Sequence, residues 1–391
     1  MTNRRRIAMV TGSRADYGLL FWLMKDLQLS DDVDLQLIVT GTHLSERFGM
    51  TVKQIEADGF TVNATVPIPV EDNTVLGVTM ALSAATEGIG KCFSQLAPDL
   101  LVLLGDRYEA FAAAQAAMLA RIPIAHIHGG ETTEGVIDEA IRHAITKLSH
   151  LHFVAAEDFR NRVIQLGEDP NRVWTVGAAG LDNVKRLPLM SKSVLQESLG
   201  VELRNPSFLV TYHPVTLKPD EKGATMATLL GLLLETGGTI IVTGVNADTG
   251  AHVLRSEAER IAAEHPDRII FVESLGSLRY LSAIANVNVV IGNSSSGLIE
   301  APSLGTATID IGERQQGRPR APSVVHCNED AASLKQALDK ALSAKHIALC
   351  SERQTPYGTP GAAQRISKVL REHPLHGLIM KSFYNLSSKA L

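Results

Sequence analysis

Acidic, basic and histidine side chains gather in one short window of this chain. They form three clusters: Gly105-Asp106-Arg107, His126-Ile127-His128-Gly129-Gly130-Glu131 and Asp138-Glu139-Ala140-Ile141-Arg142-His143. Carboxylates, imidazoles and guanidinium groups are what proton transfer and the stabilisation of developing charge require. Helix capping would explain one acid per helix, but not acids, histidines and arginines together within about 40 residues. The window therefore indicates a catalytic site.

Apolar segments separate the three clusters and must position them. Leu100–Leu104, Phe111–Ala120 and Ile122–Ala125 are almost wholly apolar, which predicts buried strands and a buried helix. Ligands collect at the carboxyl ends of the strands in such α/β sheets. Asp138 and Arg142 are four residues apart in a helical pattern, so we expect them to share a face and to pair, which would keep Asp138 ionised. The alternative is an ordinary surface pair.

Strand and helix patterns alternate along the whole chain. Strands are predicted at 7–11, 35–39, 100–104, 122–127, 151–155, 173–176, 208–211, 239–243, 269–272, 287–291 and 306–311. Helices are predicted at 17–27, 109–119, 138–148, 224–235 and 251–264. Repeated strand–helix units with apolar strands imply parallel sheets that are covered on both faces.

The number of strands exceeds what one tidy sheet would hold, and the alternation pauses at Leu187–Ser191. We therefore predict an α/β fold of two Rossmann-like domains with a central cleft. The first domain would span 1–187 and the second 188–365. A helical segment at 366–391 would pack back on the first domain.

Composition excludes several classes of protein. The net charge of −5 comes from 37 basic and 42 acidic residues scattered along the chain, so no nucleic-acid footprint is present. No apolar run is long enough for a membrane span or a signal-peptide core, so we expect neither membrane insertion nor secretion by that route. The three cysteines lie far apart without metal-ligand spacing, which suits a reducing cytoplasm.

Two loops could bind an anion. The turn at Thr11–Gly18 lacks the Gly-x-Gly-x-x-Gly spacing that is the usual signature of a dinucleotide cofactor. The chain has no Walker loop either. Arg14 stands at a helix start and suits a phosphate, unless the turn is a plain one with a solvated arginine.

The second loop, Gly292–Pro302, combines small residues with serines before a helix. Backbone N–H groups, hydroxyls and the helix dipole together suit a diphosphate. Glu300, one turn into the helix, could accept from two ribose hydroxyls. Ser294 and Ser295 could instead be mere helix caps. Arg314 follows a later strand and could be either a ligand or solvated.

In order along residues 5–365, six motifs resemble the hydrolysing UDP-N-acetylglucosamine 2-epimerases of bacterial sialic acid biosynthesis. They are the turn at Thr11–Tyr17, Gly105-Asp106-Arg107, His126–Glu131, Asp138–His143, His213-Pro214 and Gly292–Gly297. The resemblance implies a glycosyltransferase-B-like fold, with UDP on the C-terminal domain and the sugar facing the N-terminal one. It also implies a homodimer and no cofactor.

Carried over by position, the resemblance assigns roles to individual residues. Asp106 and Asp138 would be catalytic carboxylates, with Arg107, Arg142, His128 and Glu131 beside them. The UDP and phosphate ligands would be Arg14, His213, Ser294, Ser295, Gly297, Glu300 and Arg314. Many relatives have Glu at the position of His128, so the division of labour among His128, Glu131 and Asp138 stays open. A metal held by the His-x-His pair and Glu131 is a minor alternative, because no further ligand pattern accompanies it.

The family reaction releases UDP and inverts C2, giving free N-acetylmannosamine through a 2-acetamidoglucal. The alternatives are the same reaction on UDP-2,4-diacetamido-2,4,6-trideoxyglucose for legionaminic acid, a glycosyltransferase on the same fold, and a noncatalytic UDP-sugar sensor. The retention of Asp106, Glu131 and Asp138 weighs against the sensor.

Overall fold

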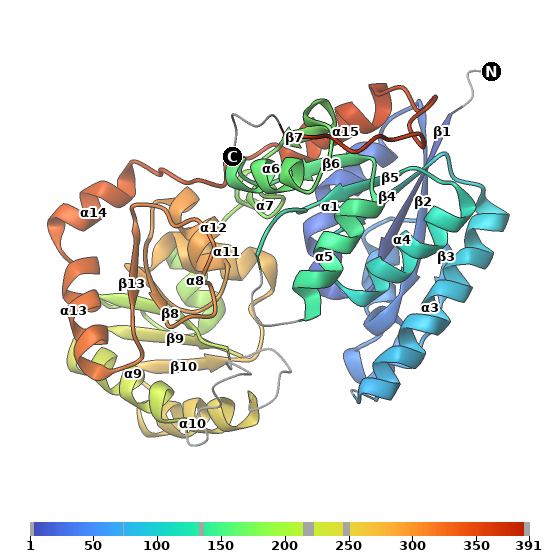
Figure 1. Cartoon of the computed structure of the whole chain (residues 1–391). Coiled ribbons are helices and arrows are strands. Elements are labelled where there is room, and N and C mark those ends of the chain that lie inside the picture. Colours follow the sequence, from blue (N-terminus) through green and yellow to red (C-terminus); the bar gives the residue numbers. More distant parts are fainter. Residues whose placement is uncertain (1–3, 73, 133–136, 214–222, 245–250, 387–391) are drawn as a thin grey trace. The chain divides into compact units, whose positions relative to one another are not determined.

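The chain divides into two compact units, each with its own parallel sheet. The computed structural model describes residues 4–72, 74–132, 137–213, 223–244 and 251–386. The N-terminal unit comprises Met1–Asp182 and Pro360–Leu391, and the C-terminal unit comprises Asn183–Thr359. The chain thus crosses between the units after Asp182 and again before Pro360, somewhat earlier than the boundaries expected at 187 and 365. Both units are α/β folds, as the sequence predicted (Figure 1).

The N-terminal unit contains a seven-stranded parallel sheet in the order β3-β2-β1-β4-β5-β6-β7. Its strands are β1 (Arg5–Thr11), β2 (Val33–Thr40), β3 (Val62–Val66), β4 (Leu100–Leu104), β5 (Ile124–Ile127), β6 (Leu151–Val154) and β7 (Val173–Thr175). Its helices are α1 (Arg14–Gln28), α2 (Val52–Ala57), α3 (Val75–Leu96), α4 (Tyr108–Ala120), α5 (Ile137–Leu148), α6 (Glu157–Gln165) and α15 (Ala362–Glu372), with α7 (Leu181–Arg186) at the first crossover. Short 3-10 turns lie at Gly41–Leu44, Glu46–Phe48 and Pro170–Arg172.

Helices cover both faces of this sheet because the strand residues are apolar on both faces. Ile7 and Met9 of β1 belong to one core cluster, whereas the alternate residues Ala8 and Val10 belong to another. Full burial of a side chain as large as Ile7 or Met9 stabilises the fold by about 1.5–3 kcal/mol. The strands are therefore fixed in position, and they set where the loops at their carboxyl ends begin.

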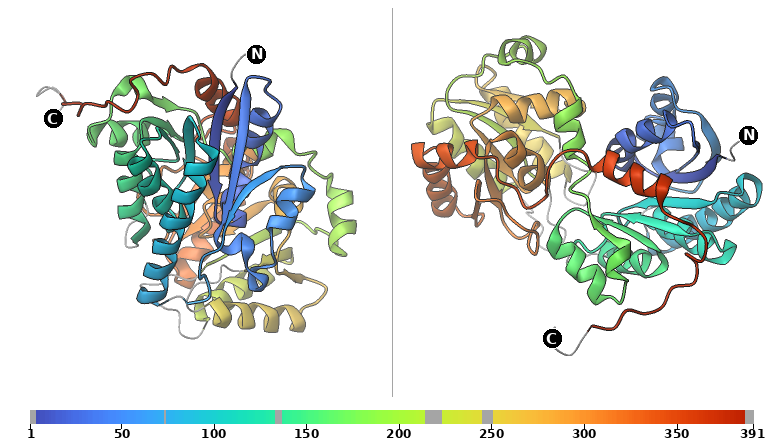
Figure 2. Two further views of the ribbon diagram at one scale, coloured as in Figure 1. Left: turned by 90° about the vertical axis from the view of Figure 1, so that its right-hand side faces the viewer. Right: turned by 90° about the horizontal axis from the view of Figure 1, so that it is seen from above.

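The end of the chain returns to the N-terminal unit. Helix α15, red in Figures 1 and 2, lies beside α1 and buries Ala362, Ile366 and Leu370 in the same core cluster. The return of this segment was expected, but its helix was predicted too long. Within the described part, residues 373–386 contain neither helix nor strand.

A buried carboxylate anchors this tail. Glu168 is 3% exposed and accepts hydrogen bonds from Lys147 (2.5 Å), His152 (3.0 Å) and Lys381 (2.9 Å). Lys381 also donates to the backbone carbonyls of Lys147 and Ser149. Burial alone would raise the pKa of Glu168, but His152 and the two lysines outweigh it and lower the pKa from 4.5 to about 2.

We expect Glu168→Gln to lower the free energy of unfolding at pH 7 by about 3 kcal/mol. Because the pKa of Glu168 is lowered in the folded state, its contribution is present above pH 4.5 and is lost as the pH falls toward 2. Urea unfolding of both proteins between pH 7 and 3 should therefore show a difference that shrinks below pH 4.5. The exposed Glu56→Gln is the control, and a difference independent of pH would contradict the assignment.

The C-terminal unit contains a six-stranded parallel sheet in the order β10-β9-β8-β11-β12-β13. Its strands are β8 (Ser207–Thr211), β9 (Thr239–Thr243), β10 (Ile269–Val272), β11 (Val289–Gly292), β12 (Ala307–Ile311) and β13 (Val324–Cys327). Its helices are α8 (Lys192–Leu199), α9 (Ala224–Glu235), α10 (Ala251–Glu264), α11 (Gly276–Asn286), α12 (Ser296–Leu304), α13 (Ala331–Ala341) and α14 (Ala344–Ser351).

Every strand predicted from the sequence is present, with ends shifted by a few residues at most. The sequence missed β3 and β13, which both lie at the edge of a sheet. In β3 the residues alternate between exposed and partly buried, so no apolar run marks the strand. In the described ranges, no helix is both long and apolar enough to cross a membrane.

Candidate active site

The polar window of the N-terminal unit lies at the carboxyl ends of neighbouring strands. Asp106 follows β4 after Gly105, whose φ is +72°, and His128 follows β5. Strands β4 and β5 pair in parallel, so both residues lie at the carboxyl ends of these neighbouring strands. This is where the sequence predicted the site to be.

Arg142 of α5 joins these two loops. Its side chain is 5% exposed, forms an ion pair with Asp106 and donates to the backbone carbonyl of His128 (2.9 Å). The helical spacing predicted a pair with Asp138, and that prediction is corrected, because the guanidinium lies on the carboxylate that follows β4. Asp138 lies half-buried in the first turn of α5, where the helix dipole favours a negative charge.

His128 and Glu131 form a buried pair. His128 Nδ1 lies 2.6 Å from Glu131 Oε1, and the side chains are 10% and 5% exposed. The backbone N–H of Ala179 donates to His128 Nε2 (3.2 Å). Nε2 must therefore carry the lone pair, so Nδ1 carries the proton and donates it to the Glu131 carboxylate. The geometry specifies a neutral imidazole in one tautomer.

His126 supports the turn that presents Asp106. It is fully buried, its Nε2 contacts the Gly105 carbonyl (2.8 Å), and its Nδ1 contacts Thr146 Oγ1 (3.2 Å). Burial lowers the pKa of His126 to about 3, so the ring is neutral and Nε2 donates to that carbonyl. His126 and His128 thus contact different partners. Across the described ranges no three potential ligands gather as a metal site would require.

Arg107 is not directed at Asp106. It stands before α4 and donates two hydrogen bonds to Glu109, from Nε (3.1 Å) and from NH2 (2.9 Å). Glu109 is 2% exposed and packs against the turn that follows β1, because a Cβ on Gly12 would come within 3.1 Å of the Glu109 carboxyl carbon. Glu109 was not singled out from the sequence. The signal in the sequence is that Glu109 is an acidic residue in the first turn of an otherwise alanine-rich helix.

The first βα turn is satisfied by its own side chains. Asp16 accepts from the backbone N–H groups of Gly12 and Ser13 (both 2.9 Å), and Ser13 and Asp16 form a capping box. These backbone donors are occupied by a carboxylate, so any phosphate contact from this turn depends on the exposed side chain of Arg14.

The serine loop of the C-terminal unit begins at a glycine that nothing larger can replace. Gly292 has a φ of +142°, and a Cβ there would lie 2.0 Å from the Thr211 carbonyl oxygen. The next residue, Asn293, is fully buried and ties the loop to β8. Its side chain accepts from the His213 backbone N–H (2.7 Å) and donates to the His213 carbonyl (2.8 Å). Asn293 was not singled out from the sequence.

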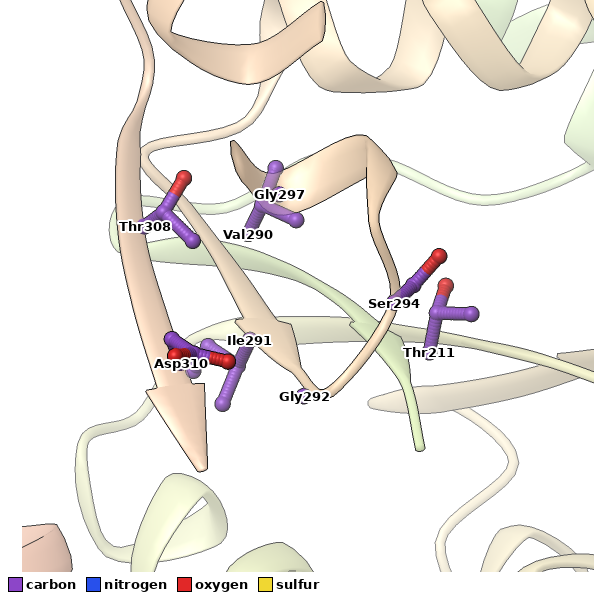
Figure 3. Close-up of a pocket in the computed structure, with 8 residues that line it drawn as sticks. All are labelled: Thr211, Val290, Ile291, Gly292, Ser294, Gly297, Thr308 and Asp310. Carbon is purple, nitrogen blue, oxygen red and sulfur yellow. The ribbon is translucent and has the colours of Figure 1, made fainter. Parts of the chain in front are cut away.

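A chain of hydroxyl groups continues the loop. Ser296 donates to Ser294 (3.0 Å), the Tyr280 hydroxyl contacts Ser296 (2.6 Å) and Thr211 (3.3 Å), and Thr211 contacts Thr243 (2.8 Å). Figure 3 shows Ser294 and Thr211 side by side beyond the bend at Gly292. The chain links the carboxyl ends of β8, β9 and β11. It therefore orients the hydroxyl groups of Ser294 and Ser296.

Of the two predicted serine ligands, Ser295 differs from a simple helix cap. Ser295 is at the cap position of α12 with helical backbone angles, and its side chain makes no capping hydrogen bond. Gly297 has a packing reason to be glycine, because a Cβ would lie 2.8 Å from Thr308 of β12. This close approach brings the α12 N-terminus over the sheet. Glu300 lies half-buried on the same helix.

His213 and Arg314 meet at the loop from other elements. Arg314 NH1 donates to the Asn293 carbonyl (3.0 Å), which also accepts from Gln315 (2.9 Å). His213 is 7% exposed, and burial together with Arg314 lowers its pKa to about 4. His213 is therefore a neutral hydrogen-bonding group at pH 7. The residues that follow it, 214–222, lie outside the described residues and include Pro214 of the His-Pro motif.

The residues predicted from the sequence thus fall into two groups. Asp106, His128, Glu131 and Arg142 gather at the carboxyl ends of β4 and β5 in the N-terminal unit, and Asp138 lies one turn before Arg142 on α5. The second group gathers around the serine loop of the C-terminal unit: His213, Ser294, Ser295, Gly297, Glu300 and Arg314. Arg107 and Arg14 lie on neighbouring loops of the first unit.

Comparison with known proteins gives matches along nearly the whole chain. The family described as UDP-N-acetylglucosamine 2-epimerase matches residues 25–371. The chain is 35% identical over 376 residues to a Legionella pneumophila protein named UDP-N,N'-diacetylbacillosamine 2-epimerase (hydrolyzing), covering 96% of this chain and 98% of that one. It is 36% identical over 370 residues to polysialic acid biosynthesis protein P7 of Escherichia coli, covering 94% of each.

The fold is shared with solved structures. The crystal structure of UDP-GlcNAc 2-epimerase from Neisseria meningitidis bound to UDP-GlcNAc matches with a TM-score of 0.78 at 16% identity, covering 93% of this chain and 99% of that one. At that identity the match speaks for the fold alone. Two parallel-sheet α/β units in this order make up the glycosyltransferase-B-like fold.

Proposed function

This chain belongs to the hydrolysing UDP-N-acetylglucosamine 2-epimerase family, and from that premise we propose that it converts UDP-N-acetylglucosamine and water into UDP and N-acetylmannosamine. The product would supply sialic acid biosynthesis. The observation that carries the proposal is a pair of carboxylates at the carboxyl ends of β4 and β5. Asp106 is held there by Arg142, and Glu131 by His128.

The reaction needs carboxylates because C2–H of the substrate is not acidic. Departure of UDP with the electron pair of the C1–O bond leaves positive charge at C1, which acidifies C2–H. Transfer of that proton to a base, on the face opposite to the leaving group, then gives a 2-acetamidoglucal. Water adds its oxygen to C1, and C2 takes a proton on the face opposite to the one from which the first proton was removed. This inversion at C2 gives the manno configuration. The site must therefore stabilise positive charge and handle two proton transfers about C2.

The N-terminal unit offers groups for each task. Asp106 is the carboxylate that we assign to the first proton transfer or to the charge at C1. It forms an ion pair with the buried guanidinium of Arg142. Glu131 and Asp138 are the groups available for the second proton and for the activation of water.

The C-terminal unit offers groups for the departing diphosphate. Ser294, Ser295 and the first turn of α12 present hydroxyls and a positive dipole end, and Arg314 adds a cation. Glu300 is the proposed partner of the ribose hydroxyls. His213 would donate a hydrogen bond, and Arg14 is a further proposed phosphate ligand.

A second substrate has a specific observation in its favour. The Legionella relative, at 35% identity, is named for UDP-N,N'-diacetylbacillosamine, which is the 2,4-diacetamido-2,4,6-trideoxyglucose nucleotide. The chemistry at C1 and C2 is the same for both sugars. The two substrates differ only at positions 4 and 6, so parallel assays separate them.

Incubation with each UDP-sugar in heavy water tests the proposal. We expect release of UDP and a free manno sugar that carries deuterium at C2, because the proton removed from C2 is replaced from solvent. Proton NMR follows both products. A free gluco sugar without deuterium would indicate simple hydrolysis, and transfer of the sugar to an added acceptor in place of water would indicate a glycosyltransferase.

We further propose a homodimer in the cytoplasm. The cysteines Cys92, Cys327 and Cys350 are all free, which fits a reducing compartment. The dimer is proposed by analogy with the family. Analytical ultracentrifugation would measure the mass in solution.

A further inference from the structure

We propose that His128 is a positioning residue, which joins Glu131 to the turn where the chain leaves the N-terminal unit and exchanges no proton with the substrate. This inference rests on the proposed function, because Glu131 is taken as a proton-handling group of that reaction. The tautomer on which it depends can be measured without any substrate.

Both ring nitrogens of His128 are already engaged. Nδ1–H donates to Glu131 (2.6 Å), and Nε2 accepts from the Ala179 backbone N–H (3.2 Å). A proton shuttle needs one nitrogen that faces the substrate and can gain or lose a proton. A second proton on this ring would meet the N–H of Ala179 and abolish that hydrogen bond.

The backbone of His128 is fixed as well. Its φ is +63°, a left-handed conformation that is uncommon outside glycine, although histidine, asparagine and aspartate adopt it more often than other residues. The N–H donates to the Phe153 carbonyl (2.8 Å), and the carbonyl accepts from Arg142 (2.9 Å). Since Arg142 also pairs with Asp106, the same contacts that hold His128 link the two carboxylate loops.

Ala179 lies in the turn that precedes α7, within the N-terminal unit and shortly before the chain leaves it. Three residues later, Asp182 accepts hydrogen bonds from the N–H groups of Gly361 and Ala363 (2.6 Å for the latter). Arg365 in turn donates to the Val176 carbonyl at 3.0 and 2.7 Å. The outgoing and returning segments of the chain are thus tied together, and His128 connects this junction to Glu131. Through His128, Glu131 is thus linked to the two segments of the N-terminal unit that lie next to its chain crossings.

Two substitutions separate positioning from proton transfer. In His128→Asn the side-chain amide can still donate to Glu131, and asparagine tolerates a positive φ, but it cannot reach Ala179. In His128→Ala both contacts are lost. If His128 only positions Glu131, we expect His128→Asn to retain kcat within about tenfold and His128→Ala to fall well below it. A proton-transfer role would make both variants equally inactive, at about 10²- to 10⁴-fold below the native enzyme.

Nitrogen NMR of the protein labelled at histidine tests the tautomer directly. The signals of His128 are identified by their absence from His128→Asn. At pH 7, with and without UDP, we expect Nδ1 to be the protonated nitrogen and Nε2 the unprotonated one. A doubly protonated ring, the opposite tautomer, or a folded His128→Asn protein as inactive as His128→Ala would overturn the proposal. If the protein turned over no UDP-sugar, the proposed function would fail, while the NMR result would still decide the tautomer.

Discussion

Asp106→Asn is expected to lower kcat by about 10²- to 10⁴-fold, the range for loss of one proton-transfer group, while UDP binding stays within about twofold. The amide matches the carboxylate in shape and can still contact Arg142, but it cannot accept a proton or stabilise positive charge at C1. The proposed UDP ligands belong mainly to the C-terminal unit, so the substitution leaves them intact. Turnover assays and calorimetric titration with UDP measure the two quantities.

The same strand provides a matched control at its other end. Asp99 precedes β4 and forms an ion pair with Arg6 (2.8 Å), with the side chains 34% and 42% exposed respectively. Asp99→Asn therefore removes a carboxylate from an aspartate–arginine pair of the same unit without touching the window. We expect its turnover to equal that of the native protein. Loss of UDP binding in a folded Asp106→Asn protein would instead place Asp106 in the nucleotide site.

Gly292→Ala is expected to destabilise the C-terminal unit by about 3 kcal/mol or more and to abolish UDP binding. Gly292 pairs with Thr211 across β11 and β8, and a methyl group there would lie 2.0 Å from the Thr211 carbonyl oxygen. Both atoms belong to the backbone, so the strands must separate or the loop must move. Either change displaces Asn293 and Ser294. Urea unfolding and calorimetric titration with UDP measure the effects.

Gly231→Ala is the comparison for this substitution. Gly231 lies within α9, and a Cβ there would meet nothing within 4 Å. Because alanine favours a helix more than glycine does, this variant should be more stable by up to about 1 kcal/mol. If Gly292→Ala were as stable as Gly231→Ala, the close approach of β11 and β8 would not be what requires the glycine.

The sequence predicted the sheets well because the strands of a doubly covered parallel sheet are short apolar runs. Leu100–Leu104 and Thr239–Thr243 were placed with their observed bounds. Strand β3 was missed because its polar and apolar residues alternate, so no apolar run marks it, and β13 was missed because His326 interrupts its four residues. The C-terminal helix was overextended, since the pattern did not reveal that residues 373–386 form neither helix nor strand and are held by Lys381.

By itself the sequence predicted which loops hold the candidate site residues: Asp106, His128 and Glu131 follow strands, and Ser294 and Ser295 open a helix. It could do so because burial of an element is a local property of its residues. Only the tertiary structure decided the partners. Arg142 pairs with Asp106, 36 residues away, although a carboxylate lies four residues away on its own helix. Partner choice depends on which groups the packed strands and helices bring within hydrogen-bond distance, and no local spacing contains that information.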